Sequence, residues 1–133
     1  DDRKGGCFRI APTGSDVTFK QFYWPETNVL VTRFLSPRGA AELTDFMPVH
    51  EDTQGPHGHQ IIRRLTAVRG TIEFEMVCLP AFNYARDPHE TTLYERGASF
   101  RSDTLSLGLA TQVQLEQKEG GVTARFTLRE GET

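Results

Sequence analysis

The segment Gly121-Val-Thr-Ala-Arg-Phe-Thr-Leu-Arg129 alternates apolar and polar side chains along its length. The same alternation occurs in Thr71–Leu79 and in Leu105–Leu109. Successive side chains of a β-strand point to opposite faces, so such a strand buries one face and leaves the other in water. The three segments therefore predict antiparallel strands that share one apolar core.

Turn-forming residues divide the rest of the chain into short extended segments. Ser36-Pro-Arg-Gly39 is typical of a type I turn, and Arg69-Gly70 and Glu119-Gly-Gly121 mark further turns. Strands are expected near residues 7–11, 17–24, 28–35, 41–49, 60–68, 71–79, 92–96, 104–109, 112–117 and 121–128. One or two of these segments should merge or fail, which leaves about eight or nine strands. The predicted fold class is all-β, an antiparallel β-sandwich with little or no helix.

Three segments are less regular. Gln60–Arg69 fits either a strand or a helix that ends at Gly70, and its β-branched residues favour the strand. His50–His59 is expected to be a polar surface loop, since it contains glycine, proline and three histidines. Ala81–Thr91 is expected to cross from one sheet to the other.

Length and composition restrict the class of protein. A chain of 133 residues corresponds to about one domain, and we expect a single β-sandwich domain over residues 1–133. The net charge of −3 argues against nucleic acid as a partner, because such binding needs Lys and Arg to neutralise phosphates. No apolar run approaches the ~18 residues of a membrane span, so no membrane partner is expected.

The chain has two cysteines, Cys7 and Cys78, without the spacing of a metal site. We expect both to be buried thiols of a protein in a reducing compartment, the cytoplasm. A disulfide between them stays open at this point.

Four blocks follow one another in the first part of the chain. They are Gly5-Gly-Cys-Phe-Arg-Ile-Ala-Pro12, Thr27-Asn-Val-Leu-Val-Thr-Arg-Phe34, Ser36-Pro-Arg-Gly39 and Glu42-Leu-Thr-Asp-Phe-Met-Pro-Val49. In this order they resemble the N-terminal β-sandwich domain of bacterial and archaeal glycoside hydrolase family 15 proteins, the glucoamylases and trehalases. The resemblance returns at Val68-Arg-Gly70 and at Pro80-Ala-Phe-Asn-Tyr-Ala-Arg86.

The resemblance implies a super-sandwich that packs against an α/α-barrel catalytic domain of the same polypeptide and helps to order it. The intact protein would hydrolyse α-glucosidic bonds, and its catalytic carboxylates would lie in the barrel. No residue of this chain is therefore matched to either carboxylate. The resemblance also implies that the chain is a fragment, truncated at both ends, and therefore prone to self-association. It does not separate glucoamylase from trehalase parentage.

Carboxylates are the side chains that a glycosidase requires in pairs. Glu73 and Glu75 share one strand face at a separation of roughly 6.5–7 Å, but we expect them to form the solvated side of an alternating strand. Asp45 is more unusual, because alternation places it on the apolar face of its strand. A carboxylate there needs a partner, and Arg9, Arg33 or Arg63 could form a structural ion pair with it.

The segment of the sequence that most resembles a metal-binding motif is His57-Gly-His59. Histidines two apart on a strand could share an ion, as in a cupin. A cupin would also need a glutamate four or five residues later, where this chain has Arg63 and Arg64. We therefore expect a polar loop, no metal and no cofactor.

Aromatic side chains offer a way to bind sugars. Tyr23 and Trp24 are adjacent, and Phe82 and Tyr84 flank Asn83. If exposed, these rings could stack on carbohydrate; otherwise they pack in the core or between domains.

The sequence therefore predicts a non-catalytic N-terminal domain of a glycoside hydrolase that acts on α-glucosidic bonds. Its partner would be the α/α barrel. The first alternative is a carbohydrate-binding module for α-glucans, and the second is a small cupin-like metal-binding protein.

Overall fold

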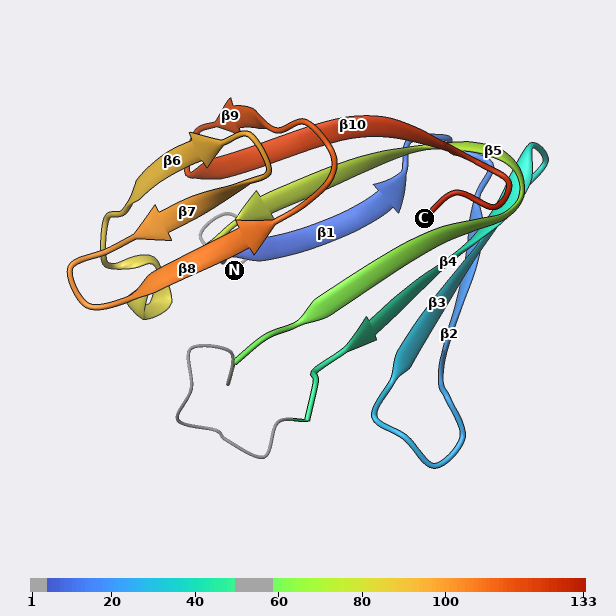
Figure 1. Cartoon of the computed structure of the whole chain (residues 1–133), viewed down its shortest axis with the longest axis horizontal. Coiled ribbons are helices and arrows are strands. Elements are labelled where there is room, and N and C mark those ends of the chain that lie inside the picture. The colour runs from blue at the N-terminus through green and yellow to red at the C-terminus, as the bar shows by residue number, and fades with distance from the viewer. Residues whose placement is uncertain (1–4, 50–58) are drawn as a thin grey trace. The chain divides into compact units, whose positions relative to one another are not determined.

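The computed structural model describes residues 5–49 and 59–133, of which 62% lie in strands and 2% in a helix. Ten strands form two antiparallel sheets in these residues, one of seven strands and one of three (Figure 1). The strands are β1 (Cys7–Pro12), β2 (Thr18–Tyr23), β3 (Leu30–Ser36), β4 (Gly39–Phe46), β5 (Ile62–Leu79), β6 (Glu90–Tyr94), β7 (Gly97–Arg101), β8 (Ser106–Ala110), β9 (Glu116–Lys118) and β10 (Gly121–Arg129). The predicted all-β sandwich is confirmed. Within the described residues, no helix has the length and apolar character of a membrane span.

The chain divides into two compact units, and β5 and β10 contribute residues to both. The first unit comprises residues up to Thr13 and Phe74–Phe126, and the second comprises Gly14–Glu73 and Thr127–Thr133.

In the second unit, β2, β3, β4 and the first part of β5 pair in that order. Large and small side chains match across one face of this sheet, because Phe34 lies opposite Ala41 and Ala41 lies opposite Ala67. In the next row Leu43 lies opposite Leu65. These side chains are all buried, so the alternation seen in the sequence becomes a continuous apolar face.

The first unit contains the second half of β5, which pairs with β1, and a three-stranded sheet with β7 at its centre. Its core contains Cys78 of β5, Val122 of β10, and Ala98 and Phe100 of β7, together with Phe82. Leu109 of β8 packs against this cluster. Strands from both sheets therefore contribute to one core, as a sandwich requires.

Phe82 belongs to the segment that connects β5 to β6. A short 3-10 helix, Asn83–Ala85, follows it. The segment leads from the seven-stranded sheet to the three-stranded one, so the predicted crossing of Ala81–Thr91 between sheets is confirmed.

The turn predicted at Arg69-Gly70 is wrong, because β5 continues through it as one strand of 18 residues. A bulge lies at Val68, because Ala40 and Ala41 of β4 lie opposite Arg69 and Ala67 and the register shifts between them. Gly70 follows two residues later, opposite Gly39. Its φ of +70° favours glycine, and a Cβ there would lie 2.1 Å from the carbonyl oxygen of Arg38. The strand continues because each half has a partner, β4 up to Gly70 and β1 from Phe74 onward. The helical alternative for Gln60–Arg69 is excluded for the same reason.

Other boundaries also differ from the prediction. Strand β4 ends at Phe46 and not at Val49, since Pro48 cannot donate to the ladder. The sequence analysis missed β7, because its small residues Gly97, Ala98 and Ser99 carry little strand preference. With β7 added and two segments merged into β5, the described residues hold ten strands and not eight or nine.

Neither Cys7 nor Cys78 forms a disulfide, and only Cys78 is buried. The expectation that Cys7 is buried is therefore wrong. In the ladder Cys7 lies opposite Leu79 and Phe8 lies opposite Cys78, so the two thiols point to opposite faces of the sheet. This geometry excludes a disulfide between them.

Candidate functional site

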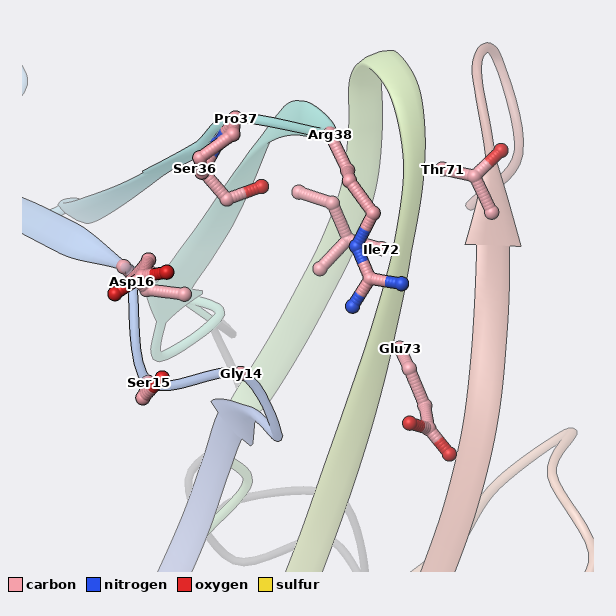
Figure 2. A pocket seen from close by; sticks show the side chains of 10 residues that line it. Gly14, Ser15, Asp16, Ser36, Pro37, Arg38, Thr71, Ile72 and Glu73 are labelled. Atoms are coloured by element: carbon pink, nitrogen blue, oxygen red, sulfur yellow. The ribbon is translucent and has the colours of Figure 1, made fainter.

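A pocket of about 360 Å³ lies in the second unit, between the β1–β2 loop, the β3–β4 turn and β5 (Figure 2). It is lined by Gly14, Ser15, Asp16, Val17, Ser36, Pro37, Arg38, Thr71, Ile72 and Glu73. Sequence reasoning missed this pocket, because its walls come from three segments that only the fold brings together.

Backbone hydrogen bonds fix the β3–β4 turn at the rim of this pocket. The hydroxyl of Ser36 accepts from the N–H of Gly39 and donates to the carbonyl of Gly39, both at 3.2 Å. The N–H of Thr71 donates to the carbonyl of Arg38 at 3.2 Å, which attaches the turn to β5 next to Gly70. The type I turn chemistry predicted for Ser36–Gly39 thus builds one wall of the pocket.

The pocket carries charges of both signs. Arg38 extends past Ile72 on the side of Glu73, whereas Ser15 and Asp16 lie on the opposite wall (Figure 2). Glu73 is half-buried and Asp16 is exposed. These groups could hydrogen-bond a polar molecule, but none of the described lining residues is aromatic, so a sugar ring would have nothing to stack on.

Glu75 contributes to an ion-pair network in the first unit. Its Oε2 accepts from Nη2 of Arg9 of β1 at 2.8 Å, and its Oε1 lies 3.7 Å from Nη2 of Arg125 of β10. These side chains are 33–65% exposed, so each pair contributes at most about 1 kcal/mol. Glu75 thus joins three neighbouring strands, as a structural side chain does.

Asp45 has both carboxylate oxygens occupied. Nε of Arg63 donates to Oδ1 at 2.9 Å and Nη2 donates to Oδ2 at 3.0 Å. The two residues lie directly opposite each other across β4 and β5, and their side chains are only 18% and 16% exposed. A half-buried bidentate pair of this kind satisfies the carboxylate that alternation places on an apolar face.

The other two arginines considered for Asp45 have different partners. Nε of Arg33 donates to Oε1 of Glu42 at 2.8 Å, across β3 and β4. Arg9 pairs with Glu75, as described above.

The four aromatic candidates are in different environments. Tyr23 is 64% exposed and Trp24 is 57% exposed, at the end of β2 and just after it. Tyr84, in the 3-10 helix, is 91% exposed. Phe82 does not fit the sugar-stacking role considered for it, because it is 4% exposed and packs in the core of the first unit. Its ring lies against His89, with the ring centroids 5.1 Å apart. It cannot offer a ring face to a sugar.

Only one histidine of the His57/His59 pair lies within the described residues. His57 lies outside the described residues, and His59 is exposed. Within the described residues, no group of three or more His, Cys, Asp or Glu side chains could hold a metal ion.

A second, shallower hollow of about 770 Å³ lies in the first unit. It lies beside His89 and Ser102, whose hydroxyl caps the β7–β8 turn by accepting the N–H of Leu105 at 3.1 Å. The side chain of His89 lies within 3.2 Å of the carbonyl of Gly120 through Nε2. The side chains of Ser102 and His89 thus stabilise the turn and the core of the first unit.

Comparison with known proteins gives three trehalases. The chain is 34% identical over 129 residues to the trehalase of Thermoplasma acidophilum, a match that covers 93% of this chain and 22% of the trehalase. It is 34% identical over 122 residues to the trehalase of Thermoplasma volcanium, covering 88% and 19% respectively. It is 31% identical over 99 residues to the trehalase of Mycolicibacterium smegmatis, covering 64% and 15%.

No family model matches the chain, and no solved structure matches it significantly. The chain spans about a fifth of the length of the Thermoplasma relatives that it matches. The fold defines an antiparallel β-sandwich domain. The chain is homologous to part of these trehalases, and the matches support its resemblance to the N-terminal domain of glycoside hydrolase family 15 trehalases and glucoamylases.

Proposed function

We propose that this chain is a non-catalytic domain of a glycosidase that cleaves α-glucosidic bonds, as in trehalose or malto-oligosaccharides. It would pack against an α/α-barrel catalytic domain of the same polypeptide and help to order it. One observation carries the proposal: the match to the Thermoplasma acidophilum trehalase covers 93% of this chain but only 22% of that enzyme. Most of the relative's chain therefore lies outside the region that this sandwich matches.

The carboxylates support a non-catalytic role. A glycosidase needs one carboxyl group that protonates the leaving oxygen and a second that acts as base or nucleophile. Asp45 and Glu75 are instead held by arginines of neighbouring strands. Both residues therefore serve the sheet, which leaves the chemistry to another domain.

Exposed apolar side chains support a docking role. Contiguous apolar patches on a soluble domain mark surfaces that another domain or protein covers. The most exposed, each more than half accessible, are Phe19, Tyr23, Trp24, Met47, Val49, Ile61, Val68, Tyr84, Tyr94 and Leu105.

The isolated chain should release no glucose from trehalose or maltose. The assay measures glucose by a coupled oxidase, with the Thermoplasma acidophilum trehalase as positive control. The same trehalase without its matching fifth should lose most of its activity, because the proposed catalytic domain would lack the ordering surface. Turnover by the isolated chain that disappears with Glu73→Gln or Asp45→Asn would refute the proposal. A truncated trehalase with undiminished activity would refute the ordering role.

Binding of α-glucans is the second candidate function, and the exposure of Tyr23 and Trp24 favours it. Trp24 is the only tryptophan of the chain, so its fluorescence reports on this surface alone. Titration with maltodextrin should change the emission if a sugar stacks on it. An emission spectrum that is unchanged at saturating sugar argues for the docking role instead.

A further inference from the structure

Strand β2 is the last strand at one end of its sheet. All six of its residues, Thr18–Tyr23, are exposed, and within the described residues no strand pairs with its outer side (Figure 1). An edge strand of this kind presents unpaired N–H and C=O groups to any further strand.

One hydrogen bond shows which main-chain groups face outward. The N–H of Trp24 donates to the carbonyl of Val29 at 2.8 Å, so residue 24 faces β3. In an antiparallel ladder the main-chain groups of alternate residues face the same neighbour. The N–H and C=O groups of Phe22 and Lys20 therefore face β3. Those of Phe19, Gln21 and Tyr23 face the open edge.

The side chains of these residues also alternate. Phe19, Gln21 and Tyr23 lie on one face, where Nε2 of Gln21 donates to the hydroxyl of Thr32 at 2.9 Å. Lys20 and Phe22 lie on the other face, where the guanidinium of Arg33 lies 5.7 Å from the centre of the Phe22 ring.

We infer that β2 is the docking edge for a second copy of this chain, which pairs with it antiparallel about a two-fold axis at Gln21. A two-fold axis perpendicular to the sheet keeps each face on its own side, so opposed residues must come from the same face. Gln21 then lies opposite Gln21 of the second copy, and Phe19 lies opposite Tyr23 of the second copy. Each of these pairs exchanges two main-chain hydrogen bonds, because all three residues face the open edge.

The side chains favour this register over one with its axis at Lys20. An axis at Lys20 would place two ammonium groups directly opposite each other, which is destabilising. The axis at Gln21 instead places Lys20 opposite Phe22 of the second copy, where its ammonium can approach the ring as Arg33 already does. It also forms two aromatic pairs between Phe19 and Tyr23, which stabilise cross-strand contacts.

The occupant is a second copy because the edge complements itself at each position of this register. This pairing involves only β2 and its contacts with β3, so it is independent of the proposed role as a glycosidase domain. The contact forms a small isologous interface, so dimers should form reversibly and at high protein concentration.

Cysteine cross-linking tests the register in a Cys7→Ser background, which removes the exposed native thiol. Residues opposite each other in a hydrogen-bonded pair have Cα atoms about 5.5 Å apart, which a disulfide can span. The Gln21→Cys variant should therefore form an interchain disulfide under mild oxidation. The Lys20→Cys variant is the matched control, because diagonal positions lie about 7–8 Å apart and cannot be bridged. Equal cross-linking of the two variants, or cross-linking of the control alone, would overturn the register.

Sedimentation velocity tests the association itself. The sedimentation coefficient of the native chain should rise with concentration toward that of a dimer. The Gln21→Pro variant should remain monomeric, since proline removes an N–H that faces the open edge and none that bonds to β3. Circular dichroism checks that the variant keeps its fold, and the cysteine pair decides the question if it does not. A native chain that is monomeric at all concentrations, or a folded Gln21→Pro variant that dimerises, would overturn the inference.

Discussion

Phe100 and Phe19 are the same kind of side chain on the same kind of strand, but they have opposite surroundings. Phe100 lies on β7, the central strand of its sheet, and is 1% exposed. Phe19 lies on the edge strand β2 and is 65% exposed. Each is flanked on both sides by a polar residue, so the immediate sequence does not distinguish them. The difference shows that the position of a strand in its sheet decides whether an apolar residue stabilises the fold or provides a surface for binding.

Replacing each phenylalanine should show this contrast most strongly. Phe100→Ala removes a ring from a closed core and should lower the free energy of unfolding by about 3–5 kcal/mol. Phe19→Ala, at low protein concentration, should change it by about 0.5 kcal/mol or less. Chemical denaturation followed by circular dichroism measures both. Similar losses for the two variants would mean that Phe19 is covered in the folded monomer.

Two glycines with positive φ sharpen the contrast between a packed and an open position. Gly70 has a φ of +70°, and a Cβ there would meet the carbonyl of Arg38, whereas Gly120 has a φ of +77° and nothing within 4 Å. Gly70→Ala adds a clash to the backbone strain and should cost about 2–4 kcal/mol. Gly120→Ala adds the strain alone, about 1–2 kcal/mol. Thermal unfolding of both variants gives the comparison, and equal costs would exclude a close approach of Gly70 to the carbonyl of Arg38.

The ion pairs of Asp45 and Glu75 should also differ in their contribution to stability. The more buried pair should contribute more, but the difference should be smaller than that between the two phenylalanines. Asp45→Ala leaves the half-buried Arg63 without its bidentate partner and should cost about 1–3 kcal/mol. Glu75→Ala removes exposed pairs and should cost about 1 kcal/mol or less. A salt titration of the unfolding midpoint provides an independent measure, since salt should screen the Glu75 pairs more than the Asp45 pair. A larger loss for Glu75→Ala would contradict this ranking.

Chemical labelling of the two thiols tests the same contrast between exposed and buried positions, with the smallest expected effect. Cys7 is exposed and Cys78 is buried, so a thiol reagent should label one cysteine per folded chain and two after denaturation. Mass spectrometry of the labelled chain counts the reacted groups. Rapid labelling of Cys78 in the folded chain would show that the core of the first unit opens readily.

Much of the candidate chemistry could be predicted from residue types. Alternation placed Asp45 on an apolar face, and physical chemistry then required a cationic partner for it. The partner could not be chosen among Arg9, Arg33 and Arg63, because that choice depends on the register between strands. Phe82 and Tyr84 form a similar case, since two rings separated by one residue differ in exposure only because one of them enters a core.

The amino-acid sequence by itself determined the all-β class, since a period of two is a local property that each strand carries without its neighbours. Blocks such as Glu42–Val49 also indicated the family, because the order of the blocks is a property of the amino-acid sequence itself. The tertiary structure decided the rest. It joined two expected strands into β5, built a pocket from three separate segments, placed Cys7 at the surface and left β2 at an edge. These features depend on which strands pair and in which register, and strand pairing is a non-local property that no single segment contains.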